Sequence, residues 1–301
     1  MDVGHTNAQF NTEISCSIEL TLKTTVVCCG LHLMGSLKFY KYRGCDDLDR
    51  DLRIISDCKI WYSNPTQFND PFDCAPTVVL FTIEEKREFS RSLLNSENPD
   101  IPDAWRETLQ RALNDEQLLN QMVDRVLTPE YLEKRMSQYG VLSLSSTNDN
   151  ALLWSHYSSS HRGFAIEFDV TQIAHYHVPN LEKYPLDYFE SRLMAKPVDY
   201  SANRPPSISS AHHLATPYFH KGSEWAYEEE YRVLSNFGPG LKPFDCDLIS
   251  GIYLGCNVSN ETKQKVLKVV QDFTEKTGNS IRKYQARTDN RTYELHFDEI
   301  Q

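Results

Sequence analysis

The residues best suited to chemistry form an acidic and aromatic segment that runs from Glu224 to Leu234. Three consecutive carboxylates, Glu228, Glu229 and Glu230, are followed closely by Arg232. If the chain is extended here, neighbouring side chains point to opposite faces, so Glu228 and Glu230 share one face and Glu229 points away. Two carboxylates beside aromatic rings can hold a cation or a positively charged transition state. The alternative is a solvated acidic turn in which the glutamates pair with Arg232.

The composition restricts the classes of protein that could carry this segment. The chain has 301 residues, of which 40% are hydrophobic and 24% are charged, as in an ordinary globular protein. Its formal net charge of -11 argues against a broad nucleic-acid surface and therefore against a nucleic-acid partner. No apolar run is long enough to cross a bilayer, so no membrane partner is expected.

The cysteines and the N-terminus indicate a cytoplasmic protein. The eight cysteines stand at positions 16, 28, 29, 45, 58, 74, 246 and 256. None forms a Cys-x-x-Cys pair, and no secretory signal accompanies them, which predicts reduced thiols and neither a disulfide framework nor a zinc site. Residues 1–36 are expected to be an extension outside the domain, and Met34 is hypothesised to be the natural start.

The elements that must position the acidic segment are strands and helices in irregular order. Alternating or β-branched segments predict strands over 37–43, 59–63, 141–145, 164–168, 252–255, 281–286 and 291–297. Thr82 and Glu85 have the spacing of a capping box, and they open a helical insertion over roughly 83–138 that is expected to cover a sheet. The lack of a repeated strand–helix–strand order predicts one α+β domain over 37–301 with an antiparallel or mixed sheet. No glycine-rich phosphate-binding motif is present.

Four groups of residues occur in an order that resembles a known family. They are Phe39–Arg43, Trp61–Ser63 with Phe68–Asp73, Leu153–Tyr157 with His161–Phe164, and Trp225–Arg232. Together they resemble the domain of unknown function 2971 family over roughly residues 37 to 255. Because that family name carries no activity, a second resemblance must supply one.

The order of the features is also similar to that of the ADP-ribosyltransferase superfamily. That superfamily has a first strand with a basic or histidine residue, a Ser-x-Ser strand and a late Glu-x-Glu. The resemblance implies an ADP-ribosyltransferase-like fold and NAD as the substrate. It also implies that Lys41 or Arg43 contacts the dinucleotide, and that Ser143 and Ser145 support the nicotinamide ribose. Lys41 stands where a histidine would fall, so the choice between the two basic residues stays open.

The same resemblance assigns roles in the reaction. Glu230 would hydrogen-bond the ribose 2′-hydroxyl and stabilise an oxocarbenium-like cation, while Glu228 would position or activate the acceptor. Arg43 would contact the pyrophosphate. Aromatic side chains, from Tyr42, Trp61 or Tyr157, would sandwich the nicotinamide or adenine ring.

Further motif positions are predicted to line the site. They are Asn69, Asp70, Trp154, His156, His161, Arg162 and Arg232. Asn69 and Asp70 are also turn-forming residues, and a turn alone would explain them. On a helix, Trp154 and His156 lie on different faces, so Trp154 could anchor in the core while His156 reaches a cleft.

Three functions follow from these residues. The first is an NAD-dependent ADP-ribosyltransferase or NAD glycohydrolase that acts on a small dinucleotide and a macromolecular acceptor. Such enzymes often serve as toxins or phage-defence effectors. The second is a metal-dependent nuclease or phosphodiesterase in which Asp70, Asp73, Glu228 and Glu230 hold a divalent ion. The third is a non-catalytic module that senses a small ligand.

Overall fold

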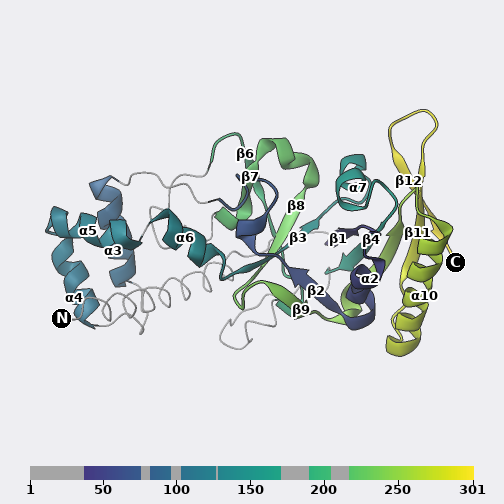
Figure 1. The fold of residues 1–301 in the computed structure, drawn as a ribbon, viewed down its shortest axis with the longest axis horizontal. Coiled ribbons are helices and arrows are strands. Elements are labelled where there is room, and N and C mark those ends of the chain that lie inside the picture. Colours follow the sequence, from purple (N-terminus) through teal and green to yellow (C-terminus); the bar gives the residue numbers. More distant parts are fainter. Residues whose placement is uncertain (1–36, 76–81, 96–102, 127, 171–189, 205–216) are drawn as a thin grey trace.

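The computed structural model describes residues 37–75, 82–95, 103–126, 128–170, 190–204 and 217–301 (Figure 1). The expected extension 1–36, with Met34, lies outside the described residues. Among the helices of the described part, none is both long enough and apolar enough to cross a membrane.

The centre of the molecule is an eight-stranded sheet with the order β12-β11-β10-β4-β1-β3-β8-β5. Its strands are β1 (Lys38–Arg43), β3 (Gly140–Ser145), β4 (Phe164–Asp169), β5 (Lys196–Pro197), β8 (Glu230–Ser235), β10 (Ile249–Leu254), β11 (Arg282–Thr288) and β12 (Leu295–Ile300). Only β10 and β11 pair in parallel within this sheet. The mixed, mostly antiparallel sheet confirms the predicted α+β class.

Two small sheets complete the strand content of the described residues. In one, β2 (Lys59–Tyr62) pairs with β9 (Gly240–Pro243) in the antiparallel sense. In the other, β6 (Asp199–Ser201) pairs with β7 (His220–Gly222) in the parallel sense. Strand β7 of the second pair contains Lys221, which lies in the site described below.

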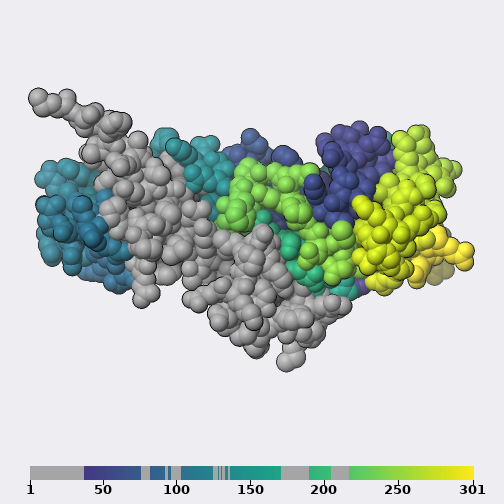
Figure 2. All heavy atoms as spheres, turned by 90° about the horizontal axis from the view of Figure 1, so that it is seen from below, coloured from purple at the N-terminus to yellow at the C-terminus, as the bar shows by residue number. Residues whose placement is uncertain are grey.

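The helices form two groups. The first group packs beside the large sheet and comprises α2 (Leu48–Asp57), α7 (Ala151–Tyr157) and α10 (Asn260–Thr277). The second comprises α3 (Ile83–Asn95), α4 (Asp103–Ala112), α5 (Glu116–Val126) and α6 (Pro129–Met136). Helices α3–α5 lie at the end of the molecule opposite the C-terminal elements (Figures 1 and 2). Their shared apolar cluster continues to Val141 of β3 and Leu234 of β8, so this block extends the core beyond the end of the sheet.

Strand alternation divides the core around β1. Phe39 faces the cluster that contains the buried residues of α2 and α10. Tyr40 and Tyr42 face the opposite side, where they join Trp154 of α7. This alternation leaves Lys41, on the face of Phe39, at the edge of the main core.

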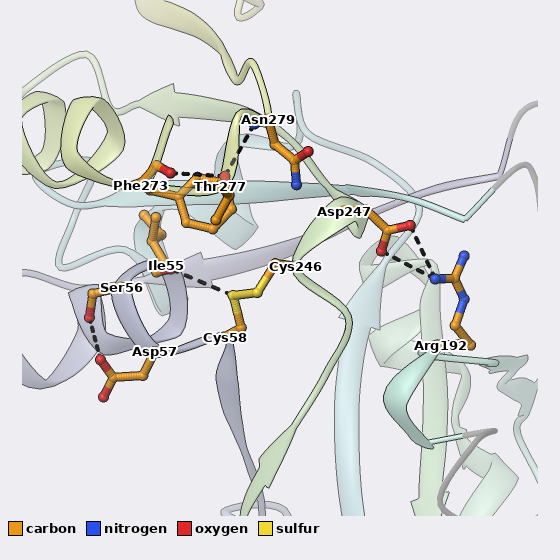
Figure 3. Close-up of a disulfide and its surroundings, with 10 residues drawn as sticks. All are labelled: Ile55, Ser56, Asp57, Cys58, Arg192, Cys246, Asp247, Phe273, Thr277 and Asn279. Carbon is orange, nitrogen blue, oxygen red and sulfur yellow. Dashed lines mark hydrogen bonds and ion pairs between the residues drawn. A yellow bond between two sulfur atoms is a disulfide. The ribbon is translucent and has the colours of Figure 1, made fainter. Parts of the chain in front are cut away.

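The cysteine prediction is wrong for one pair, because Cys58 and Cys246 form a disulfide (Figure 3). Cys58 ends α2 in a left-handed conformation with φ of 49°, and Cys246 begins the short helix η5 (Cys246–Leu248). The two residues are 188 positions apart, and such a separation produces no local spacing signal in the sequence. Cys45, Cys74 and Cys256 are free thiols.

The strand predicted over 291–297 is also partly wrong, since β12 begins only at Leu295. The Asp289 carboxylate accepts hydrogen bonds from the backbone amides of Arg291 and Thr292 and holds them in a turn. An aspartate that caps its own turn competes with strand pairing in this way.

Candidate functional site

The candidate site lies where β1 and β3 separate. The two strands pair at Tyr40 and Ser145, and the start of β3 bonds instead to Ser63, which faces Val141. The following part of β1 and the end of β3 therefore border a cavity of about 460 Å³. The strand order β1-β3-β8 places the basic residues of β1, the Ser-x-Ser of β3 and the Glu-x-Glu at the start of β8 next to one another.

Residues from three separate segments of the chain, within 40–73, 143–159 and 221–230, line this cavity. They are Tyr40, Lys41, Tyr42, Arg43, Gly44, Asp46, Arg50, Asp51, Phe68, Asn69, Asp73, Ser143, Leu144, Ser145, Leu153, His156, Tyr157, Ser159, Lys221, Glu228 and Glu230. The predicted residues Lys41, Arg43, Ser143, Ser145, Glu228 and Glu230 thus converge on one cavity, together with Tyr42, Asn69, His156 and Tyr157.

The acidic segment reaches the cavity by a different backbone path from the expected extended one. Glu228 ends a 3₁₀ helix, η4 (Ser223–Glu228), and Glu229 turns the chain with φ of 45° into β8, which starts at Glu230. Glu228 and Glu230 are buried, whereas Glu229 is exposed and accepts a hydrogen bond from Ser146. The prediction of an extended conformation is wrong. Glu229 nevertheless points away from the side on which Glu228 and Glu230 lie, as expected.

Two cations hold the carboxylates of the site. The Arg232 guanidinium donates to both oxygens of Glu230, at 2.7 and 2.8 Å, and to Asp73 Oδ2 at 2.7 Å. Lys221 Nζ lies 3.2 Å from Glu230 and 3.5 Å from Asp73, and it also donates to Glu228. Three carboxylates around two cations leave one net negative charge. Asp73 Oδ1 is buried and has no hydrogen-bond partner in the described part of the chain.

The electrostatic surroundings keep Glu230 ionised. Burial alone would raise the pKa of its carboxyl, but the Arg232 charge and hydrogen bonds, the Lys221 charge and a hydrogen bond from Ser143 lower that pKa to about 2. At neutral pH, Glu230 is therefore a fixed negative charge on the cavity wall.

Glu228 is held by a tyrosine. The Tyr157 hydroxyl donates to Glu228 Oε1 at 2.6 Å. Burial, with this hydrogen bond and the Glu228 charge, raises the Tyr157 pKa well above its usual range, so the hydroxyl remains a donor. Ser145 Oγ donates to the backbone carbonyl of Glu228 at 2.7 Å. The Ser-x-Ser strand therefore positions both glutamates, since Ser143 bonds Glu230.

A second part of the lining, called here the cationic wall, contains the basic residues Lys41, Arg43 and Arg50 together with the carboxylates Asp46 and Asp51. Lys41 Nζ donates to the Ser143 carbonyl at 2.7 Å, and burial together with the Arg43 charge lowers the Lys41 pKa to about 7. Burial also lowers the Arg43 pKa, and the nearest ion-pair oxygen, on Asp51, lies 4.0 Å away. Arg43 Nε is buried without a hydrogen-bond partner in the described residues. A negatively charged ligand in the cavity would supply the opposite charge that Lys41 and Arg43 lack.

Several predicted site residues lie away from the cavity. Trp154 is fully buried in the core and donates Nε1–H to the Asn148 carbonyl at 2.7 Å, as expected for an anchor. His161 stacks on Trp154, and Arg162 Nε donates to the Ser159 carbonyl at 2.8 Å.

Asp70 and Arg232 also do not line the cavity. The Asp70 carboxylate accepts from the Phe72 amide at 2.9 Å, which is the turn-forming role. Arg232 lies behind Glu230 and holds that carboxylate without reaching the cavity.

Sequence reasoning missed Lys221 and gave Asp73 a different role. Lys221 is an isolated lysine in a weakly patterned region, and no local signal distinguishes it from a surface lysine. Asp73 belongs to the Phe68–Asp73 motif, and the sequence suggests for it only the role of a metal ligand. Within the described ranges, no group of three or more metal-ligating side chains is arranged to hold a metal ion. The carboxylates instead converge on the Lys221 ammonium.

Comparison with known proteins supports the resemblance to a family. Residues 153–233 match the family model described as a protein of unknown function, DUF2971, so the predicted resemblance is supported over this segment. The matched segment contains Tyr157, Lys221, Glu228, Glu230 and Arg232. No curated protein and no solved structure matches the chain.

Proposed function

We propose that this chain, with its DUF2971 segment bordering the charged cavity, is an NAD-consuming enzyme, either an ADP-ribosyltransferase or an NAD glycohydrolase. One observation carries the proposal: a single cavity is lined both by a group in which three basic residues accompany two carboxylates, the cationic wall, and by a cluster with a net negative charge, the anionic wall. NAD has the complementary distribution, because its pyrophosphate is anionic and its nicotinamide ring is cationic. The volume of about 460 Å³ is in the usual range for small-molecule sites.

The cationic wall would bind the pyrophosphate. Arg43 lines the cavity, its side chain is 21% exposed, and its nearest ion-pair oxygen lies 4.0 Å away, so a phosphate oxygen would reach the guanidinium and form a charge-assisted hydrogen bond. Lys41 would gain a proton as the phosphate approaches, since a nearby negative charge raises a lysine pKa. Arg50 also lines this wall and is exposed enough to reach an incoming ligand.

The anionic wall would act on the bond between nicotinamide and ribose. When this bond breaks, nicotinamide leaves with the bonding electron pair, and positive charge develops on the ribose carbon and ring oxygen. Ionised Glu230 stabilises that charge from a fixed position. The acceptor hydroxyl, or water, then bonds to the ribose carbon and passes its proton to Glu228.

The biological role follows from the reaction class. Transfer to a macromolecular acceptor, or simple depletion of NAD, would suit a toxin or a phage-defence effector. Such an enzyme would act in the cytoplasm, where the Cys58–Cys246 disulfide would have to persist against reducing thiols. The oxidation state of that pair in cells is therefore a direct check of the location.

The test is nicotinamide release from NAD by the purified protein. Glu230→Gln should lower the rate about 100-fold or more, because a preorganised charge is lost from the transition state. Glu229→Gln is the matched control, since Glu229 is adjacent but exposed and outside the cavity. Unchanged release by Glu230→Gln, or no release by the wild-type protein, would reject the proposal.

A second variant covers the case in which Glu230→Gln fails to fold. Tyr157→Phe removes one hydroxyl that donates to Glu228 and leaves the ion pairs of Arg232 intact. It should slow turnover while the melting temperature changes little. Calorimetric binding of NAD without nicotinamide release would favour the ligand-sensing alternative over the enzyme.

A further inference from the structure

A second cavity, also of about 460 Å³, adjoins the charged cavity. The two cavities share Phe68 and Asn69, which follow the short helix η1 (Pro65–Gln67) and form the partition between them. The remaining residues that line the second cavity are Trp61, Ser63, Asn64, Gln67 and Pro239. The proposed reaction uses only the first cavity, so the second is left without a role.

The second cavity has a different chemical character. None of its lining residues carries a formal charge, and two of them, Trp61 and Phe68, are aromatic. Strand alternation in β2 buries Ile60 and Tyr62 completely and leaves Trp61 55% exposed. An indole that stays in water keeps a ring face available for stacking with a flat ligand.

Carboxamide groups accompany the aromatic rings. The Asn64 oxygen already accepts from the amide and the hydroxyl of Thr66 and so caps η1. Gln67 and Asn69 are exposed, and neither side chain makes a hydrogen bond within the part of the chain that the structure describes. A carboxamide carries one acceptor oxygen and two N–H donors in one plane. Two such groups therefore remain available beside two rings.

This combination matches the chemistry of a nucleobase. A base presents two flat faces for stacking and an edge on which hydrogen-bond donors and acceptors alternate. Aromatic rings recognise the face, and carboxamides recognise the edge. A charged or purely aliphatic ligand would leave these groups unused.

We propose that the second cavity is a nucleobase subsite, in which Trp61 and Phe68 contact the face of a purine and Gln67 and Asn69 bond its edge. The base is either the adenine end of the dinucleotide or a base of a separate acceptor molecule. The link between this subsite and the reaction rests on the proposed function, whereas base binding itself does not.

Calorimetric titration with adenosine tests the subsite directly, because adenosine has no phosphate for the cationic wall to bind. Wild-type protein should bind adenosine, and Trp61→Ala should weaken binding about tenfold or more, as stacking contacts typically contribute. Gln67→Ala should also weaken it. Leu241→Ala is the control, since Leu241 pairs with Trp61 across β2 and β9, is 45% exposed and lines neither cavity.

Competition with NAD identifies the source of the base. If adenosine and NAD exclude one another and Trp61→Ala weakens both, the subsite holds the adenine of the dinucleotide. If they bind together, the subsite holds a base of a second molecule. Absence of adenosine binding at millimolar concentration, or equal binding by wild type and Trp61→Ala, would overturn the subsite. Trp61-dependent adenosine binding without nicotinamide release would reject the proposed function and leave the subsite standing.

Discussion

At the scale of single residues, the site depends on side chains whose charges are set by burial. Glu230 is buried among cations and stays ionised, whereas Lys41 is half-buried, and desolvation together with the Arg43 charge lowers its pKa to about 7. The sequence predicted that Glu228 and Glu230 lie together and apart from Glu229, although it predicted an extended chain where the structure has a 3₁₀ helix and a left-handed turn. The role of Lys221 could not, because it depends on how β7 is placed next to β8 in space.

The lowered pKa of Lys41 predicts a pH dependence of stability. An unfolded lysine has a pKa of about 10.4, so between about pH 7 and pH 10 the unfolded state binds more protons than the folded state. Stability should therefore rise with pH through this window, by linkage. Lys41→Met removes the group and should reduce that rise.

Melting temperatures of wild type and Lys41→Met between pH 7 and 10 provide the measurement. Lys59→Met serves as the control, because Lys59 is exposed on β2 and lies outside the cavity. Parallel curves for wild type and Lys41→Met would contradict the burial of the Lys41 charge. If the melting temperatures of wild type and Lys41→Met differ near pH 7 and become similar near pH 10, the result would support the burial of the Lys41 charge.

At the scale of elements, local patterns predicted most strands but not how they meet. The alternation of β1 and β3 and the capping box of α3, in which Glu85 Oε2 accepts from the Thr82 amide, follow from neighbouring residues. The separation of β1 from β3 does not, since it depends on contacts with distant segments. The 3₁₀ turn before β8 does not follow from the sequence either, because Glu229 adopts a left-handed backbone conformation that is uncommon for residues other than glycine.

One close approach between elements fixes the end of β1. A Cβ added at Gly163 would lie 2.0 Å from the backbone oxygen of Arg43, and no side-chain rotation could relieve that contact. Gly163→Ala should therefore displace the end of β1, lower the free energy of unfolding by about 1–3 kcal/mol, and weaken NAD binding through Arg43.

Chemical denaturation and calorimetry with NAD measure the two effects. Gly222→Ala is the comparison, because its added Cβ would meet Glu224 Oε2, the end of a flexible side chain that can move away. A Gly163→Ala protein with wild-type stability and wild-type NAD affinity would show that the end of β1 is not held as described.

At the scale of the whole molecule, the Cys58–Cys246 disulfide joins the end of α2 to the segment before β10. The irregular order of the predicted strands and helices indicated the α+β class, but it could not reveal this link. Replacing both cysteines by serine should lower the free energy of unfolding by about 2–4 kcal/mol. Cys45→Ser, which removes a free thiol, should have little effect.

Thermal unfolding with and without reductant measures this contribution. Wild-type protein should melt at a lower temperature when reductant is added, and the double variant should not respond to it. A wild-type protein that ignores reductant while the double variant melts lower would assign the loss to packing around the two positions.

The same link has a consequence for proteolysis. A single peptide-bond cut anywhere between positions 58 and 246 leaves both fragments covalently attached, because the crosslink spans that whole interval. Nicked protein would therefore migrate as one species on a non-reducing gel and separate into two only after reduction.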